Sequence, residues 1–226
     1  MEEINNQKIT VAMISLNEEE AVCKVVHDIK KVLPYAEILI VDSSSDKTPE
    51  IARELSCVVI RQYPPKGYGL AMEKALLSAN GDIIITMDCD GTYPSERIPD
   101  FIMLINSGYD IVNGSRISKR PKAMPFANYI ANKAFGIIAS ILFNKKVKDL
   151  HSGMRAYRRE LVHSLKWDAE GPALPVELLL KPIVKGYKFK EIDIDYRPRI
   201  GEITLNRLKS TYWTFKRMLK IRFMKN

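Results

Sequence analysis

Short apolar segments alternate with amphipathic segments along the first half of the chain. The apolar segments have the length of buried strands, and the segments between them have the spacing of helices. The expected strands are 9–16, 37–41, 58–61, 82–87 and 110–113, and the expected helices are 18–32, 48–55, 68–78 and 96–106. This alternation predicts an α/β fold with a mostly parallel central sheet and helices on both faces.

The second half of the chain has a less regular pattern. We expect helices at 126–143, 175–185 and 204–220, and strands at 155–157 and 189–196. No internal repeat and no linker rich in Gly and Ser separates the two halves. We therefore expect a single domain with a first half at about 8–116, a second half at about 117–204 and a C-terminal helix at about 205–226.

The net charge of +8 is concentrated at the C-terminal end. No acidic residue follows Glu202, and the basic residues after it are Arg207, Lys209, Lys216, Arg217, Lys220, Arg222 and Lys225. The rest of the chain is nearly neutral, which is not typical of a general nucleic-acid-binding protein. No nucleic-acid partner is therefore expected.

Three features bear on the compartment. The three cysteines are odd in number and lack metal-ligand spacing, which favours a reducing, cytoplasmic environment. The polar start, residues 1–8, does not resemble a secretory signal. No run of about 18 apolar residues occurs, so we expect no segment that spans a bilayer.

Two carboxylates, Asp88 and Asp90, directly follow the expected strand 82–87. Residues i and i+2 of a strand point to the same side, so both can aim at one point beyond the strand end. Such hard oxygen donors suit Mg²⁺ or Mn²⁺, which commonly bind one or two carboxylates together with substrate phosphates. The alternative is a strand-to-turn junction with solvated aspartates.

Polar residues also follow other expected strands of the first half. Asn17 and Glu18 follow the first strand, Asp42 the second, and Arg116 the fifth. Ligands of such sheets bind beyond the carboxyl ends of the strands, so these residues predict one active cleft. Asp42 is placed to bind a ribose hydroxyl or a base N–H, although the segment 42–48 also suits helix capping.

Further candidates for phosphate binding are basic residues and a helix start. Lys66 and Gly67 precede the expected helix 68–78, whose N–H groups and positive potential favour phosphate. Arg155 and Arg199 carry guanidinium groups that match phosphate oxygens. The alternatives are an ion pair of Arg155 with the nearby Asp149 and a solvated basic turn around Arg199.

Two other residues each have two possible roles. Glu177 would contact an acceptor if it faces the cleft, but most carboxylates on such helices face solvent. His151 is a candidate metal or phosphate contact, with a packing role as the alternative.

Two apolar helices are candidates for a membrane surface. The C-terminal helix has an apolar stripe of Leu205, Leu208, Tyr212, Phe215 and Leu219, flanked by basic residues. A cationic amphipathic helix of this kind suits an anionic membrane surface, and packing on the protein core is the alternative. The same two possibilities apply to 126–143.

These motifs, in this order, resemble the inverting nucleotide-sugar glycosyltransferases of family 2, which have the GT-A fold. Within the family, the chain is most similar to polyprenyl- or dolichyl-phosphate mannose or glucose synthases. The matching segments are 14–19, 41–48, 66–71, 79–82, 87–94, 114–116, 149–158 and 196–201. The chain departs from the pattern at Thr92, where these synthases usually have Gln, and at Thr204 and Asn206. We also expect no following transmembrane pair, unlike in many bacterial relatives.

The resemblance implies transfer of a hexose from a nucleoside-diphosphate sugar, of the GDP-mannose or UDP-glucose type, to a polyprenyl or dolichyl phosphate with inversion. It implies a Mg²⁺ or Mn²⁺ ion on Asp88 and Asp90. The implied catalytic residues are Asp90, Arg116, Arg155 and Glu177, and the implied donor-binding residues are Asn17, Glu18, Asp42, Lys66, Gly67, Asp88 and Arg199. The first half would then be nucleotide-binding and the second half acceptor-binding.

The acceptor is inferred from a missing base. A sugar hydroxyl needs a carboxylate to accept its proton, and Glu177 is the only candidate, whereas a lipid phosphate is already anionic. A lipid acceptor implies peripheral attachment to the cytoplasmic face of a membrane. The alternatives are a saccharide or other soluble acceptor, a sugar nucleotidyltransferase and an inactive binding module.

Overall fold

The computed structural model describes residues 7–201 and 207–224. Its centre is a seven-stranded sheet in the order β3-β2-β1-β4-β6-β5-β7. The strands are β1 (Ile9–Ser15), β2 (Glu37–Asp42), β3 (Val58–Arg61), β4 (Ile83–Thr86), β5 (Ile111–Ser115), β6 (Arg155–Arg158) and β7 (Phe189–Asp193). Only the pairings of β6 with β4 and β5 are antiparallel within this sheet, which confirms the mostly parallel prediction.

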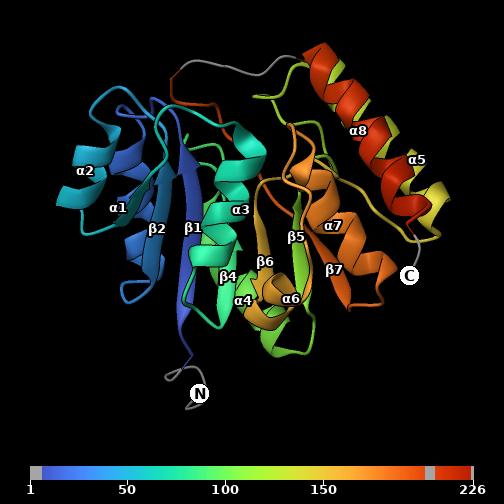
Figure 1. The fold of residues 1–226 in the computed structure, drawn as a ribbon, viewed down its shortest axis with the longest axis horizontal. Coiled ribbons are helices and arrows are strands. Elements are labelled where there is room, and N and C mark those ends of the chain that lie inside the picture. The colour runs from blue at the N-terminus through green and yellow to red at the C-terminus, as the bar shows by residue number, and fades with distance from the viewer. Residues whose placement is uncertain (1–6, 202–206, 225–226) are drawn as a thin grey trace.

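Helices cover both faces of the sheet (Figure 1). They are α1 (Val22–Val32), α2 (Thr48–Glu54), α3 (Tyr68–Ser78), α4 (Ile98–Asn106), α5 (Phe126–Phe143), α6 (Arg159–Ser164), α7 (Leu174–Val184) and α8 (Arg207–Arg222), with a short 3₁₀ turn η2 (Ser95–Arg97). The core on one face includes residues of α1, α2 and α4, and the core on the other includes residues of α3, α6 and α7 with parts of α5 and α8.

The strands are buried on both faces, which explains their continuous apolar sequences. In β1, Val11 and Met13 join one core while Ala12 joins the other. In β4, Ile83 and Ile85 likewise join the first of these cores while Ile84 joins the second. A strand covered on both sides needs apolar residues at successive positions. This burial fixes the register of the strands and therefore the positions of the residues that follow them.

The elements differ from the predicted ones mainly at their ends. Helix α1 begins at Val22 instead of 18, and it is preceded by a turn in which the Glu18 carbonyl accepts hydrogen bonds from the N–H groups of Ala21 and Val22. Helix α6 was not predicted, and β7 ends at Asp193. The predicted helix start at 204–206, with Leu205, lies outside the described residues, as do Thr204 and Asn206.

Helix α5 qualifies the expectation that no segment could span a bilayer. It is the one helix in the described ranges that is long and apolar enough to cross a membrane, and 17% of it is buried in the structure. Ile137 and Ile141 are exposed on it. Length and composition alone are weak evidence for a span. The prediction of a helix at 126–143 is confirmed, and much of its surface faces outward.

Helices α5 and α8 lie side by side at one edge of the molecule (Figure 1). The rings of Phe135 and Phe215 meet edge to face with centroids 5.1 Å apart. Tyr212 and Leu219 of the predicted stripe are exposed, whereas Met218 and Ile221 enter the core. In the described part of α8, Phe215 of the stripe therefore packs on the core residue Phe135 while Tyr212 and Leu219 face outward, so the stripe serves both predicted roles only in part.

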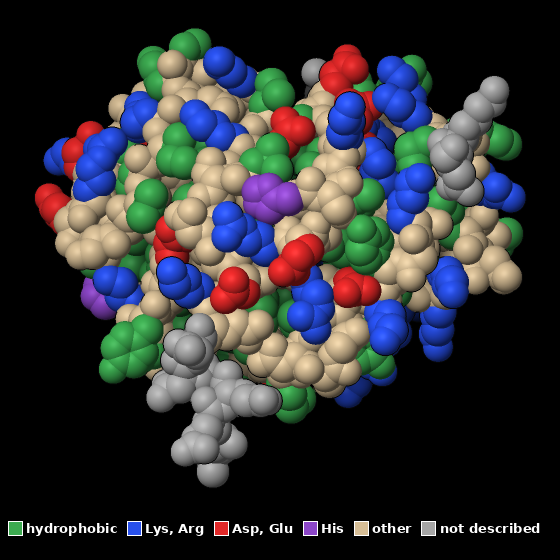
Figure 2. Space-filling view, turned by 60° about the horizontal axis from the view of Figure 1, so that its bottom comes forward, with side chains coloured by type: hydrophobic (Ala, Val, Ile, Leu, Met, Phe, Trp, Pro, Cys, Tyr) green, Lys and Arg blue, Asp and Glu red, His purple; other side chains and the backbone are tan. Residues whose placement is uncertain are grey.

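The face drawn in Figure 2 carries basic and acidic side chains interspersed with apolar ones. No continuous basic surface is visible on it, although contact with nucleic-acid phosphates needs clustered Lys and Arg. The absence of a nucleic-acid partner stays a prediction.

Candidate active site

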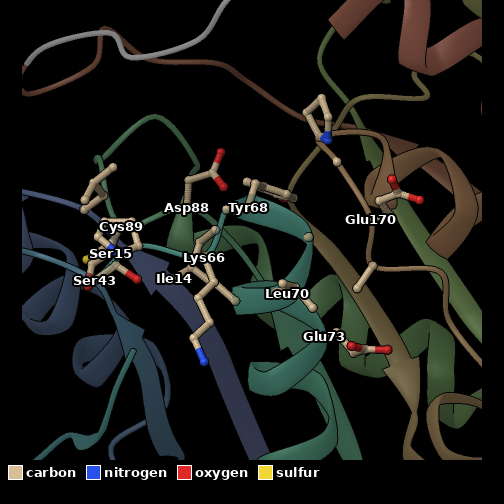
Figure 3. Close-up of a pocket in the computed structure, with 18 of the residues that line it drawn as sticks. Ile14, Ser15, Ser43, Lys66, Tyr68, Leu70, Glu73, Asp88, Cys89 and Glu170 are labelled. Carbon is tan, nitrogen blue, oxygen red and sulfur yellow. The ribbon is translucent and has the colours of Figure 1, made fainter. Parts of the chain in front are cut away.

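A cavity of about 970 Å³ opens beyond the carboxyl ends of β1, β2 and β4. The start of α3 and the loop 166–172 form its other walls. Figure 3 shows Asp88 standing between Ser15 and Ser43 on one side and Glu170 on the other. The predicted site residues that line this cavity are Glu18, Lys66, Gly67, Asp88 and Arg199.

Asp88 follows β4 and exposes its carboxylate to the cavity. Within residues 7–201 and 207–224, neither of its oxygens has a hydrogen-bond or ion-pair partner. Gly153 lies against it, and a Cβ atom at that position would stand 3.0 Å from Oδ1. Any other residue at 153 would therefore crowd the carboxylate, so glycine preserves the space around it.

Asp90 is buried behind Arg199, which lines the cavity, and is held firmly there. Its Oδ1 accepts hydrogen bonds from the Thr92 N–H at 3.0 Å and the Thr92 hydroxyl at 2.6 Å. Its Oδ2 accepts one from Arg199 at 2.6 Å. Thr92 thus orients Asp90, which gives a direct role to the residue that departs from the family pattern.

Arg199 joins Asp90 to Glu18. One terminal nitrogen donates to Asp90 and the other to Glu18. Glu18 is 8% exposed, and its Oε2 is buried with no hydrogen-bond partner in the described part of the chain. Glu18, Asp88, Asp90 and Arg199 form what we call the pocket cluster, which has three carboxylates and one guanidinium.

The pocket cluster holds its carboxylates in an unfavourable environment. Burial, opposed by the charge of Arg199, raises the pKa of Glu18 to about 7. Burial and then the charge of Asp90 raise the pKa of Asp88 to about 7. Such shifts mark sites where negative charge lacks sufficient compensation. A cation placed here would relieve that cost.

The residues fit a divalent ion of the Mg²⁺ or Mn²⁺ type. Asp88 and Asp90 offer hard oxygen donors, and the space around Asp88 is kept clear by Gly153. The described residues contain no group of three or more His, Cys, Asp and Glu side chains arranged to hold a metal. A site with only two carboxylate ligands from the protein suits an ion that completes its coordination shell with water and substrate phosphates.

Arg116 lies deeper and already has a partner. Its guanidinium pairs with both oxygens of Asp149, at 2.8 and 3.0 Å. Its Cζ atom lies over the ring of Tyr196, 5.2 Å from the ring centroid. Burial opposes ionisation of Asp149, but the charge and hydrogen bonds of Arg116 outweigh it and lower the pKa of that carboxyl. The alternative role of Arg155, an ion pair with Asp149, is therefore wrong, because Arg116 takes that place.

Arg155 does not reach the cavity, so its predicted place beside a phosphate is wrong for this structure. The side chain is 1% exposed and donates to Asn113 Oδ1 and to the backbone carbonyls of Leu150 and Pro175. These bonds occupy the guanidinium and link β5, β6 and α7. The residue has a structural role here because its donors are already satisfied.

Glu177 is also enclosed, so the prediction that it contacts an acceptor is wrong for this structure. It is 3% exposed, and Arg217 of α8 and Lys181 of α7 donate to its two oxygens. Arg217 also donates to the carbonyls of Asp168 and Glu170. We call Asp168, Glu177, Lys181, Arg217 and Lys220 the anchor cluster, because it ties α8 to the loop 166–172.

Asp42 is fully buried behind the cavity wall. The hydroxyls of Ser15 and Ser44 donate to its Oδ1, and Arg61 and the Ser44 N–H donate to its Oδ2. Contact with a nucleoside would need at least one of these partners to move, so that role stays a prediction.

Asn17 connects the ends of β1 and β2. Its Oδ1 accepts a hydrogen bond from the Ser45 N–H at 2.9 Å, and its own N–H donates to the Ser44 hydroxyl. The structure therefore gives Asn17 a positioning role at this edge of the sheet. Contact with the donor stays a prediction.

The start of α3 forms the floor of the cavity. Lys66 lines the cavity, but its ammonium group points away from Asp88 in Figure 3. Gly69 lets the loop 166–172 cross α3, since a Cβ atom there would lie 2.1 Å from the Ala169 carbonyl oxygen. The sequence pattern gave no signal for that loop, nor for the Tyr93 hydroxyl, which accepts from Gly153 N–H and Arg116.

His151 points to α8. Its Nε2 is 2.8 Å from the Thr214 hydroxyl, and its ring packs edge to face on Phe135. Burial lowers its pKa to about 4, so the ring is neutral at physiological pH. These contacts agree with the packing alternative and not with a metal ligand.

The family model for glycosyl transferase family 2 matches residues 10–166. The chain belongs to glycosyl transferase family 2. The match covers more than half of the chain, including the pocket cluster except Arg199. The resemblance to family 2 inferred from the motifs is thereby confirmed, and the chain is an enzyme of the glycosyltransferase class.

Two curated relatives extend the comparison. The glycosyltransferase is 45% identical over 207 residues to a dolichyl-phosphate hexose transferase of Haloferax volcanii, covering 91% of this chain and 90% of that protein. It is 30% identical over 200 residues to a dolichol-phosphate mannosyltransferase of Pyrococcus furiosus, covering 84% of this chain but 56% of that protein. The chain therefore spans only about half of this second relative.

Solved structures confirm the GT-A fold. A glucosyl-3-phosphoglycerate synthase from Mycobacterium tuberculosis, solved in complex with Mn²⁺, UDP and phosphoglyceric acid, superposes with a TM-score of 0.79. The alignment covers 98% of this chain and 81% of that chain at 19% identity. At that identity the likeness concerns the fold alone.

Proposed function

We propose that this enzyme transfers a hexose from a nucleoside-diphosphate sugar to a polyprenyl or dolichyl phosphate, with a divalent ion and with inversion. The observation that carries the proposal is the similarity to the Haloferax volcanii dolichyl-phosphate hexose transferase along nine-tenths of both chains. The cavity beyond β1, β2 and β4 is the place for the donor, as expected for open α/β sheets.

The pocket cluster supports a role in departure of the nucleoside diphosphate. The leaving group departs with negative charge, so the barrier falls where positive charge is already fixed nearby. Asp88 and Asp90 would hold a divalent ion, which when bound supplies Lewis-acid charge to the diphosphate. Arg199 lies at the same place and offers a fork of donors for phosphate oxygens.

The state of Glu177 removes one candidate base for a hydroxyl acceptor. Such an acceptor needs a general base within hydrogen-bond reach. The sequence pattern offered Glu177, which is occupied by Arg217 and Lys181, whereas the carboxylates of Glu73 and Glu170 line the cavity. A lipid phosphate is anionic before it arrives and can attack the anomeric carbon without losing a proton. The chain's own residues then need only to position the acceptor.

The outer surface of α5 and α8 supports peripheral membrane attachment at the cytoplasmic face. Ile141 is 75% exposed and Phe223 is 76% exposed, and Lys216 and Lys220 lie on the same edge. An apolar surface with cations binds the interface of an anionic bilayer. The anchor cluster connects α8 to the loop that lines the cavity, so a membrane-bound acceptor would approach beside it.

A lipid-extraction assay tests the proposal. The enzyme is incubated with Mn²⁺, radiolabelled UDP-glucose or GDP-mannose, and vesicles containing polyprenyl phosphate. We expect label in the organic phase that depends on the polyprenyl phosphate and disappears with EDTA. Label transferred only to water-soluble products would contradict the lipid acceptor and favour a saccharide or other soluble acceptor. In a separate incubation with UTP or GTP and a hexose 1-phosphate, release of pyrophosphate would indicate a nucleotidyltransferase. No turnover with any donor in either incubation would indicate an inactive binding module.

A further inference from the structure

The oxygens of Asp90 are already in use. Thr92 occupies Oδ1 with two hydrogen bonds, and Arg199 occupies Oδ2 at 2.6 Å. Thr92 is 1% exposed and follows Asp90 in the same turn, so its N–H stays beside Oδ1 as long as that turn is folded. Arg199 comes from a distant loop and is the partner that can be exchanged.

The loop 196–201 delivers Arg199 to this position through backbone bonds. Arg197 N–H donates to the Thr92 carbonyl and Ile200 N–H donates to the Asp90 carbonyl, both at 3.0 Å. The Arg199 side chain is the part of the loop that enters the pocket cluster. Its Nε is buried with no hydrogen-bond partner in the part of the chain that the structure describes, so this arrangement leaves one donor unused.

A divalent ion and the Arg199 guanidinium compete for the same oxygen. Two cations on one carboxylate repel each other strongly where water is scarce. The diphosphate of the donor changes this balance, because it brings several anionic oxygens that match an arginine fork. With those oxygens present, Arg199 has another partner and Asp90 Oδ2 becomes available.

We propose that Arg199 is an exchangeable counter-ion that closes the Asp90 site to a divalent ion until a nucleoside diphosphate accepts its guanidinium. The inference rests on the proposed function and adds an order of binding to it, in which the metal ion binds tightly only together with the nucleotide. The metal alone binds weakly, and metal and nucleotide strengthen each other's binding. Such mutual strengthening is a coupling free energy between two ligands and is reciprocal.

Mn²⁺ binding, measured from the electron paramagnetic resonance signal of the free ion, tests the inference without any turnover. The full chain is titrated alone and with UDP or GDP, with a correction for Mn²⁺ held by the nucleotide in solution. The variants are Arg199→Gln, which removes the charge, and Arg199→Lys, which keeps the charge but not the fork. Arg197→Gln is the matched control, since Arg197 is in the same loop but pairs with Glu96 at the surface.

We expect Arg199→Gln to bind Mn²⁺ alone about tenfold more tightly than the wild type, because the competing cation is gone. With nucleotide present, the same variant should bind Mn²⁺ more weakly than the wild type, so the sign of the effect reverses. Arg199→Lys should bind Mn²⁺ alone as weakly as the wild type and lose most of the nucleotide coupling. Arg197→Gln should match the wild type throughout.

The outcomes separate this inference from the proposed function. If Arg199→Gln binds Mn²⁺ alone no more tightly than the wild type, the counter-ion inference is overturned while metal dependence stands. If none of the proteins binds Mn²⁺ with either nucleotide, both the metal-dependent function and the inference are overturned. Thermal melting of each variant verifies that the comparison is made between folded proteins.

Discussion

The pocket cluster and the anchor cluster contain the same kinds of side chains but differ in how completely they are paired. In the anchor cluster, Arg217 is 2% exposed and donates to Glu177, to Asp168 and to two backbone carbonyls. In the pocket cluster, Asp88 has no partner among the described residues and Glu18 Oε2 is buried without one. Complete pairing indicates a structural role, whereas surplus charge beside a cavity indicates a binding site.

Among the substitutions that test this comparison, Asp90→Asn has the largest expected effect. Asparagine keeps the size and the hydrogen bond from Thr92 but removes the charge that a divalent ion needs. We expect hexose transfer to fall by about 10³-fold, because electrostatic stabilisation of a leaving group is worth about that much. The measurement is label transferred per minute at saturating donor.

The unfolding midpoint in urea is the control for Asp90→Asn and should change little. Turnover at the wild-type rate in this variant would remove the catalytic meaning of the unpaired carboxylates, and with it the distinction between the two clusters.

Arg217→Met tests the opposite side of the comparison. It leaves the Glu177 carboxylate buried with Lys181 as its remaining charged partner, so we expect the free energy of unfolding to fall by about 3 kcal/mol. The double variant Arg217→Met, Glu177→Gln should recover part of that loss. Urea denaturation followed by circular dichroism measures both.

Lys216→Met is the matched control for Arg217→Met, because Lys216 is the exposed neighbour on the same helix. It should stay within about 0.5 kcal/mol of the wild type. An equal effect of the two substitutions would show that the anchor cluster has no special role in stability.

The pH dependence of stability sharpens the description of Asp88. Its folded-state pKa is raised to about 7, so between about pH 4 and pH 7 the folded state binds more protons than the unfolded state at this group. This contribution to stability is therefore present at low pH and lost as pH rises through 7. Asp88→Asn lacks this titration, so its stability relative to wild type should rise by about 4 kcal/mol between pH 4 and pH 7 in EDTA. A constant difference between the two unfolding curves would contradict the raised pKa.

The smallest expected effect is that of His151→Gln. Loss of the contact with Thr214 should lower the free energy of unfolding by about 1 kcal/mol, and hexose transfer should stay within about threefold of wild type. A loss of activity of the size expected for Asp90→Asn would instead support the earlier prediction that His151 contacts the metal. The same transfer assay and urea titration decide between these results.

Local sequence patterns predicted most of the fold because burial on both faces makes the strands continuous apolar runs. They also placed Asp88 and Asp90 correctly at the end of β4. They could not show which partner each charged residue chooses, since those partners come from distant parts of the chain. Arg155 meets Asn113 and Pro175, and Glu177 meets Arg217, so neither residue serves the cavity.

Other features had no local signal. The loop 166–172 has no periodic pattern, and its place in the cavity depends on Gly69 and on Arg217 of α8. The insertion of β6 between β4 and β5 depends on a strand of four residues, which is too short to reveal its direction. Long-range contacts decide these parts of the site.

The crossing at Gly69 has a practical consequence for protein engineering. A methyl group at position 69 would collide with the Ala169 carbonyl, so alanine there must displace the opposite wall of the cavity. Because the colliding atoms belong to the backbone, the wall cannot yield by turning a side chain. Laboratory evolution aimed at bulkier acceptors should therefore keep glycine at position 69 and vary the side chains of the loop 166–172.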